Sequence, residues 1–295
     1  MEEFMAEVAQ RRLEEFTIAA KDGFALSATL YHPENGRDRP LVLINPAFGV
    51  KRAFYAFYAR FLAQKGYPVL TFDYRGMGGS AGPGPEKVLD PMHSWATYDI
   101  AGVQKWIEER YPSYHLMGHS GGGWLMAFLP QSEKIRSMVF LAVPDGYWKH
   151  YSGLTRFKML FTWLWTLPRH VKKNGALMKG RGWYGETLPP NVALDWAKVC
   201  RYSGFIEDES LEHPAKYAAQ YDRPTLAFSF EDDEYAPTNS SASLLRRFRT
   251  LKLNHRHIHP RDLKTDEIGH FGFLKPNRKK DLWEETAQWF DGHSD

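Results

Sequence analysis

The stretch that decides the fold is YHLMGHSGGGWL, residues 114–125. Mostly apolar residues run into Gly118-His119-Ser120-Gly121-Gly122, and then apolar residues resume. This is the pattern Gly-x-Ser-x-Gly at a junction between a strand and a helix, where the serine lies on a sharp, strained turn. Residues two positions away must be small, because the turn brings them against each other. The stretch therefore predicts a nucleophile elbow, with the Ser120 hydroxyl above a sheet and near the N–H groups of the next helix.

The alternative interpretation is a glycine-rich turn with a bystander serine, since a short pattern of this kind recurs by chance. A serine hydroxyl is a poor nucleophile without a base and a group that orients the base. In this architecture the partners follow in the order Ser, then Asp or Glu, then His. The segment FSFEDDEYAP places acidic residues where a strand ends, and DEIGHFGFL contains His270 after the last predicted strand.

Strand and helix patterns alternate on both sides of this stretch. Continuous apolar runs typical of buried strands occur at residues 40–46, 67–73, 137–143 and 224–230, and helical spacing occurs between them. This order predicts an α/β fold with a doubly wound, mostly parallel sheet. The strand pattern is interrupted after Asp145 by segments of helical character. We therefore expect residues 1–144 and 224–295 to form the core and residues 145–223 to form an inserted, mostly helical cap.

Composition limits the class of protein. The 295 residues carry a formal net charge of only +3, which gives no indication of a nucleic-acid partner. Cys200 is the single cysteine, so no internal disulfide forms, and we interpret it as a core residue.

The first sixteen residues are acidic from the second position. They show rough helical spacing at Phe4, Met5, Val8 and Leu13, which predicts a surface helix rather than a secretory signal. The apolar run at 157–167 is shorter than the roughly 20 residues of a membrane span. We expect a cytoplasmic protein.

The chain resembles the α/β-hydrolase superfamily over residues 16 to 290, and within it the branch of serine esterases, lipases and peptidases. The segments that carry the resemblance are LVLINPAFG, VLTFDYRGMGGS, LMGHSGGG, EDDEYAP and GHFGFL, all in family order. The resemblance implies that Ser120 is the nucleophile and His270 the base. It also implies an oxyanion hole formed by the N–H of Gly121 and a second N–H from the loop after LVLI. By position that donor is Ala47, with Phe48 as its neighbour, because Pro46 has no N–H.

The identity of the acid is open between three residues. The family pattern Asp-x-x-x-Pro and Pro237 together point to Asp233. Asp145 is an alternative because some members carry the acid after the earlier strand. Asp232 is the second alternative, although neighbouring side chains leave a turn in different directions.

Three further features have structural interpretations. The glycines of DYRGMGGSAGPG fit a turn near the site better than a dinucleotide site, because no helix follows them directly. His255, His257 and His259 alternate and would share one face of a strand, but we expect no metal there. His119 lies inside the elbow, and we expect its ring to pack under the loop rather than act as the base.

The resemblance and the elbow together predict a hydrolase of carboxylic esters or thioesters that acts through an acyl-enzyme and needs no cofactor. Acyl transfer by the same three residues and a non-catalytic binding protein are the alternatives. Serine at position 120 excludes dehalogenase chemistry, which needs Asp there. Aromatic residues of the predicted cap, Trp163 and Trp165, and Phe48 are expected to line a pocket for an apolar acyl chain or an aromatic ring. Arg169, Lys172 and Lys173 raise contact with an anionic lipid surface as a further possibility. The oligomeric state is open.

Overall fold

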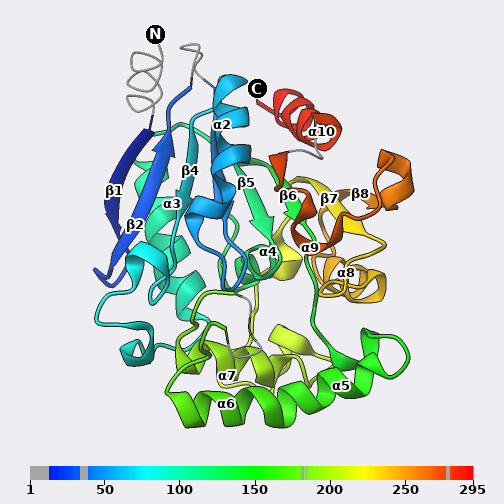
Figure 1. Ribbon diagram of the computed structural model, residues 1–295. Helices are drawn as coiled ribbons and strands as arrows, with labels where there is room; N and C mark the ends of the chain where they lie inside the picture. Colours follow the sequence, from blue (N-terminus) through cyan, green and yellow to red (C-terminus); the bar gives the residue numbers. More distant parts are fainter. Residues whose placement is uncertain (1–12, 34–38, 181–182, 184, 277–279, 295) are drawn as a thin grey trace.

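The computed structural model describes residues 13–33, 39–180, 183, 185–276 and 280–294. In this part of the chain, eight strands form one sheet in the order β1-β2-β4-β3-β5-β6-β7-β8 (Figure 1). Strands β3 to β8 are parallel, β1 is antiparallel to β2, and β2 is antiparallel to β4. The strands are β1 (Leu13–Ala19), β2 (Ala25–Tyr31), β3 (Leu41–Asn45), β4 (Val69–Phe72), β5 (Tyr114–His119), β6 (Ile135–Leu141), β7 (Pro224–Phe230) and β8 (Lys252–Ile258). The predicted doubly wound, mostly parallel sheet is confirmed.

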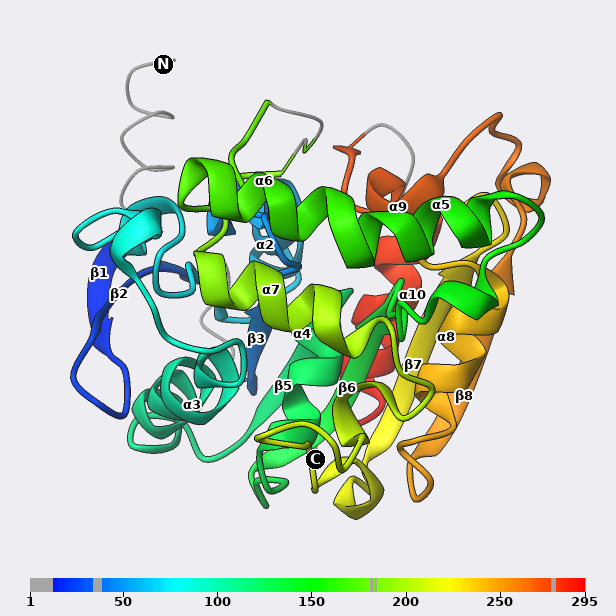
Figure 2. The same cartoon turned by 90° about the horizontal axis from the view of Figure 1, so that it is seen from below.

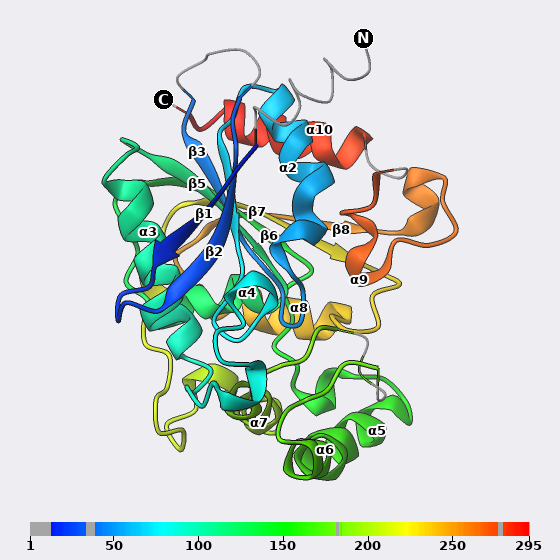
Figure 3. The ribbon, with the colours of Figure 1, turned by 60° about the vertical axis from the view of Figure 1, so that its left-hand side comes forward.

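Helices cover both faces of this sheet. The helices are α2 (Ala56–Gln64), α3 (Ala101–Glu108), α4 (Gly121–Trp124), α5 (Thr155–Phe161), α6 (Leu167–Asn174), α7 (Pro190–Val199), α8 (Thr238–Leu245), α9 (Gly269–Gly272) and α10 (Lys280–Asp291). Figure 3 shows α3 on one side of the sheet and α2 with α10 on the other. The side chains of β3 alternate accordingly: Leu41 and Leu43 belong to the core cluster on the α3 side, whereas Val42 and Ile44 belong to the cluster that includes α2 and α10 residues. Because each β3 residue is buried, this strand reads as a continuous apolar run in the sequence.

The start of the chain differs from the prediction. Residues 1–12 lie outside the described part, but Leu13, which the helical spacing included, belongs to strand β1 together with Phe16. Phe16 packs on Trp106 with ring centroids 5.0 Å apart, and Ile18 is buried. The period of two between these residues places both on the face that α3 covers, and this packing decides for a strand.

The elements that the structure describes between β6 and β7 are helices and short helical turns, joined by irregular segments. A π turn at residues 162–166 joins α5 and α6 into one continuous helix from residue 155 to residue 174, called the long helix below. The long helix and α7 lie beyond the carboxyl ends of the parallel strands (Figures 1 and 2). The exact division of this segment from the core, at residues 145 and 223, stays a prediction.

The order of the strands places the candidate site. After β3 the chain moves to β4 on one side and then crosses to β5 on the other side of β3. Ligands of open α/β sheets bind at such a switch point, outside the carboxyl ends of the strands. The loop after β3 and the turn after β5 meet here, and they carry Ala47, Phe48 and Ser120.

Candidate active site

Ser120 lies on a strained turn directly after β5. Its backbone angles, φ 50° and ψ −120°, are rare for a residue with a side chain. A Cβ on Gly118 would lie 2.4 Å from the Cα of Gly123, and a Cβ on Gly122 would lie 2.3 Å from the Asn45 carbonyl oxygen. Larger residues would not fit at either position, which is the geometry expected of a nucleophile elbow. The helix that follows has one α turn and then a 3-10 turn at residues 125–128.

The ring of His119 is fully buried. Its Nε2–H donates to the backbone oxygen of His270 at 3.1 Å, and its Nδ1 accepts from the hydroxyl of Tyr55 at 2.9 Å. Burial and the nearby His270 ring lower the pKa of His119 well below its ordinary value. The ring is therefore neutral and structural, in agreement with the interpretation that it packs under the elbow.

His270 forms a buried pair with Asp233. Nδ1 of His270 donates to Oδ2 of Asp233 at 2.8 Å, and both side chains are nearly inaccessible to solvent. Asp233 Oδ1 accepts two backbone N–H groups, from Tyr235 and Ala236, each at 2.8 Å. These bonds fix the carboxylate at the end of β7 and use one oxygen for the backbone and the other for the histidine.

Asp232 and Asp145, the two alternative acids, contact other groups. Asp232 Oδ2 accepts the N–H groups of Ile268 at 2.7 Å and Gly269 at 3.0 Å, so it holds the loop that carries His270. Asp145 is fully buried, where its Oδ1 accepts from the Ser240 hydroxyl at 2.8 Å and from Nδ1 of His150 at 3.0 Å. Of the three acids, Asp233 is the one whose carboxylate bonds to the His270 ring.

The hydroxyl of Ser120 makes no hydrogen bond to the other residues that the structure describes. Catalytic hydrogen bonds are often long or poorly aligned until a substrate is in place. The residue before Ser120 contacts His270. The rings of His119 and His270 have centroids 5.1 Å apart. The structure thus brings the elbow and the Asp233–His270 pair to the same edge of the sheet.

The loop after β3 differs from the prediction for the oxyanion hole. The N–H of Ala47 donates to the Tyr55 hydroxyl at 2.8 Å, and this hydroxyl in turn donates to His119. Ala47 is therefore already engaged, and the assignment of its amide as the second donor does not fit. The amide of the next residue, Phe48, has no hydrogen-bond partner within the described ranges. The sequence could not reveal this difference, because it depends on Tyr55, eight residues further along.

Phe48 and Gly121 lie against each other at the head of the turn. A Cβ on Gly121 would come within 2.5 Å of the Phe48 ring, so the glycine permits this close approach. Gly121 is the first residue of α4, and its N–H therefore has no partner inside the helix. The amides of Phe48 and Gly121 are the two candidate donors that the geometry leaves available.

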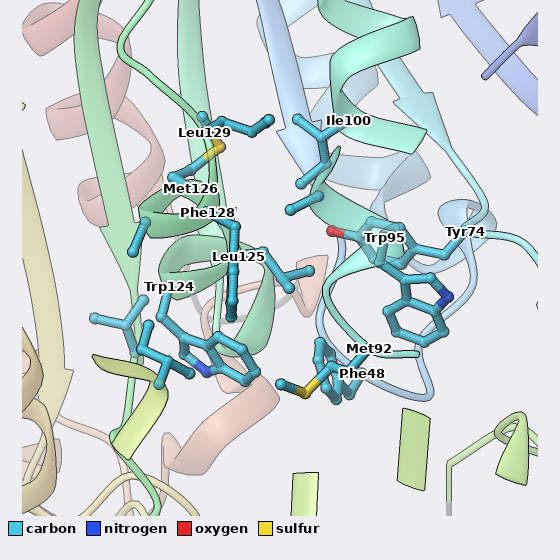
Figure 4. Close-up of a cluster of buried hydrophobic side chains, with 14 of the residues drawn as sticks. Phe48, Tyr74, Met92, Trp95, Ile100, Trp124, Leu125, Met126, Phe128 and Leu129 are labelled. Carbon is cyan, nitrogen blue, oxygen red and sulfur yellow. The ribbon is translucent and has the colours of Figure 1, made fainter. Parts of the chain in front are cut away.

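Aromatic rings fill the space between the core and the helical segment. The ring of Phe48 lies between Trp95 and Trp124, with centroids at 4.9 and 5.0 Å (Figure 4). Trp196 of α7 contacts Phe48 at 5.7 Å and also contacts Trp163 at 5.1 Å. Trp163 is thus connected to the candidate site through its contact with Trp196. Nothing in the sequence distinguishes Trp196 from the other tryptophans.

Trp165 was predicted to line the same pocket, and the structure contradicts this. Its side chain is 53% exposed, whereas Trp163 is 4% exposed. The two residues are separated by one position on a helix, so they point to different faces. Of these two tryptophans, Trp163 is the one on the inner face of the long helix.

The histidines of β8 lie at the edge of the sheet. His255 and His257 both hydrogen-bond to the Ser229 hydroxyl, at 2.8 and 2.9 Å, and His257 also pairs with Glu231 at 2.8 Å. Ligand atoms of Glu231, His257 and His259 lie within 4.8 Å of one another, a spacing at which they could hold a metal ion. His255 and His257 already have hydrogen-bond partners within the protein. We therefore keep the prediction that no metal binds here.

A surface cavity of about 350 Å³ is lined by residues including His93, Tyr98, Phe128 and His213. None of Ser120, Asp233 and His270 lines this cavity, so it is not part of the candidate site. Among the described residues, no helix is long and apolar enough to cross a membrane.

Comparison with known proteins places the chain. Two curated proteins of Escherichia coli, each described as "Uncharacterized 31.7 kDa protein in traX-finO intergenic region", are 30% identical over 132 residues, 42% of this chain. The match spans 44% of their length, which is less than half of these curated relatives.

Solved structures with a similar fold include two esterases and the protein Est1E. The esterase EaEST of Exiguobacterium antarcticum is 15% identical with a TM-score of 0.63, over 94% of this chain and all of that one. An esterase of Pyrococcus furiosus is 15% identical with a TM-score of 0.61, over 96% and 91% of the two chains. Est1E of Butyrivibrio proteoclasticus, solved with ferulic acid bound, is 17% identical with a TM-score of 0.56, over 94% and 96%. At these identities the likeness shows the fold alone.

The model of the Alpha/beta hydrolase family matches residues 41–278 of this chain. The chain therefore belongs to this family.

Proposed function

We propose that this protein is a serine hydrolase that cleaves carboxylic esters or thioesters through an acyl-enzyme. His270 takes the proton of the Ser120 hydroxyl while Ser120 attacks the acyl carbon. His270 then gives this proton to the departing alcohol or thiol. A water molecule, activated by the same histidine, attacks the acyl-enzyme and releases the acid.

The observation that carries the proposal is the 2.8 Å bond from His270 Nδ1 to Asp233 Oδ2. A carboxylate accepts but does not donate, so the proton of a neutral His270 lies on Nδ1. This leaves the lone pair on Nε2, the nitrogen that serves as a base. Asp233 also stabilises the charged imidazolium that forms when the serine proton moves. The strained elbow under Ser120 supports the same assignment.

The amides of Gly121 and Phe48 are our proposed oxyanion hole. The negative charge on the acyl oxygen develops beside the first turn of α4, where N–H groups lack helical partners. Loss of one such donor in other hydrolases costs about 3 kcal/mol of transition-state stabilisation. The close approach of the Phe48 ring to Gly121 places the two residues side by side.

The proposed substrate has an apolar acyl chain or an aromatic ring. The region beside Gly121 is built from Phe48, Trp124 and Trp196, and Trp163 packs behind Trp196. Such a lining favours apolar over sugar or peptide groups. The ferulic acid bound to the neighbour Est1E is an aromatic acid, which agrees with this class. In this proposal the helical segment serves as a cap over the site.

The proposal is tested by turnover of p-nitrophenyl esters and acyl thioesters of graded chain length, from acetyl to dodecanoyl. We expect hydrolysis of at least one series, and its loss in Ser120→Ala. Product analysis with added alcohol separates hydrolysis from acyl transfer, because transfer gives a new ester instead of the free acid. Absence of turnover on every ester and thioester would contradict the proposal and favour a binding protein.

A further inference from the structure

The outer face of the long helix carries large apolar side chains in contact with solvent. Leu154, just before the helix, is 85% exposed, and Phe157, Phe161 and Trp165 are 56%, 61% and 53% exposed. Leu164 is 43% exposed. Phe157, Phe161 and Trp165 follow each other at four positions, and Leu154 and Leu164 lie three positions from Phe157 and Phe161, so the five share one broad face. We call this set of five residues the apolar ridge.

The opposite face of the helix is already packed. Trp163, Leu167 and Val171 repeat every four residues and are buried at 5% exposure or less. They belong to the core cluster that includes residues of α7. The apolar ridge is therefore not needed to attach the helix to the protein, and monomeric proteins rarely leave such a contiguous set of large side chains in water without a partner.

The charge around the ridge has one sign. Residues 146–185 contain no aspartate or glutamate but eight basic residues, which are Lys149, Arg156, Lys158, Arg169, Lys172, Lys173, Lys179 and Arg181. Since the whole chain carries +3, the remaining residues carry a net formal charge of −5. A stretch of forty residues with basic charge alone thus coincides with this exposed apolar helix face.

The basic side chains next to the ridge are available to a partner. Within the described ranges, Arg156, Lys158, Arg169, Lys172 and Lys173 form no ion pair. All five are exposed. Arg156 and Arg169 instead lie over the rings of Phe157 and Trp165, at 5.6 and 5.9 Å, which keeps cation and apolar group together on the same face.

We propose that this face of the long helix docks on the surface of an anionic phospholipid bilayer. The helix would lie parallel to the membrane plane, with the apolar ridge inserted between the headgroups and the lysines and arginines against the phosphates. In Figure 2, seen from below, the long helix and α7 lie side by side and the long helix is visible over its whole length, so one flat approach can bring it to a surface. The inference stands on exposure and charge and does not depend on the proposed esterase activity.

A lipid surface fits better than a second copy of the chain. A symmetric dimer would place the same patch on both partners, so two strongly basic regions would face each other across the interface. Like charges opposite each other oppose association. An anionic bilayer supplies both the apolar layer and the opposite charge. The helix does not cross this bilayer, because charged residues interrupt its apolar run.

The test is flotation of the full chain with vesicles of neutral phosphatidylcholine and with vesicles that also contain 30% phosphatidylglycerol. We expect binding to the anionic vesicles alone, weakened by 0.5 M salt. Phe157→Ser with Phe161→Ser removes apolar insertion, and Lys172→Gln with Lys173→Gln removes two charges. Each pair should lower the bound fraction about ten-fold or more.

Matched controls are available elsewhere in the chain. Phe57 on α2 is 57% exposed, almost the same as Phe157, and Lys105 and Lys252 lie outside the basic region. Phe57→Ser and the Lys105→Gln, Lys252→Gln pair should float like the wild type. Circular dichroism checks folding of every variant. No binding to anionic vesicles, or equal loss in the controls, would overturn the proposal. The proposal would also be overturned if light scattering showed that the wild type is a dimer and that Phe157→Ser dissociates it. That result would favour self-association.

Discussion

Ser120 and His119 are neighbours in the chain, but their surroundings give them different roles. The ring of His119 is buried with both nitrogens bonded, and its pKa is lowered, so it is neutral at neutral pH. Ser120 is held at positive φ, a conformation that costs about 1–3 kcal/mol and persists only where the surrounding structure enforces it. The small residues at 118 and 122 and the bond from Ser120 N–H to the Leu141 oxygen at 2.9 Å do so here.

Asp233→Asn should reduce kcat about 10⁴-fold, because an amide orients His270 in the wrong tautomer while leaving the fold intact. Asp145→Asn is the matched control, since Asp145 bonds to Ser240 and His150 and should affect turnover far less. The assay is hydrolysis of one short-chain ester, with circular dichroism for folding. If Asp233→Asn keeps more than a tenth of the activity and Asp145→Asn loses nearly all of it, Asp145 is the orienting acid.

Tyr55→Phe should destabilise the protein by about 1–3 kcal/mol, because it leaves the buried Ala47 N–H and His119 Nδ1 without a partner. Urea unfolding followed by tryptophan fluorescence measures this loss. The same variant tests the oxyanion hole. If Ala47 were the donor, removing the hydroxyl would release its amide and raise kcat, whereas a donor at Phe48 predicts no gain.

At the scale of elements, the long helix explains why one tryptophan belongs to the candidate site and the other does not. Its inner residues follow a spacing of four through the π turn at 162–166, which turns Trp163 inward and Trp165 outward. Trp163 reaches the region of Phe48 through Trp196. The helix therefore has an inner face that we assign to the acyl pocket and an outer face that we assign to lipid.

Trp163→Ala should change the preference among acyl chain lengths, because it loosens the aromatic packing behind Trp196. Trp165→Ala should leave this preference unchanged, since its side chain lies on the other face. The measurement is kcat/KM for acetyl, hexanoyl and decanoyl esters in both variants. Equal reduction of all three esters in Trp163→Ala would mean that this residue supports folding alone.

Sequence patterns predicted the features that depend on local spacing. The sheet, the elbow at Ser120, and the choice of Asp233 through Pro237 follow from runs of a few residues, and the structure places the Asp233 carboxylate on the His270 ring. The patterns did not predict the engaged amide of Ala47, the role of Asp232 in holding the His270 loop, or the outward direction of Trp165. Each of these depends on contacts between distant residues. Strand β1 was missed because pairing with β2 and packing on α3 override a short helical spacing.

At the scale of the whole molecule, charge and buried histidines determine how the protein responds to its surroundings. Residues 146–185 carry basic charge alone, whereas the remaining residues carry a net negative charge, so charge is unevenly distributed along the chain. His115 and His119 on the central strand are both completely buried. Burial lowers the pKa of His115 to about 3, and His115 bonds to the hydroxyl of Ser137 at 2.9 Å.

Stability should fall as the pH drops below about 6.5. The unfolded chain then protonates His115 at its ordinary pKa, whereas the folded state binds this proton only near pH 3. This histidine alone contributes a slope of about 1.4 kcal/mol per pH unit in that window. The test is the free energy of unfolding, measured in urea between pH 4.5 and 7.5. In His115→Gln, its slope against pH should be smaller by this amount than in the wild type. An unchanged slope would contradict the assignment of a neutral buried His115.

The central claim is that Ser120 is a nucleophile activated by His270, and covalent labelling tests it most directly. A fluorophosphonate probe reacts with an activated serine, and peptide mass spectrometry locates the adduct. We predict one adduct on Ser120 in the wild type, none in Ser120→Ala, and much slower labelling in His270→Ala. No adduct on the folded wild type, or equal labelling of Ser120→Ala, would contradict the account.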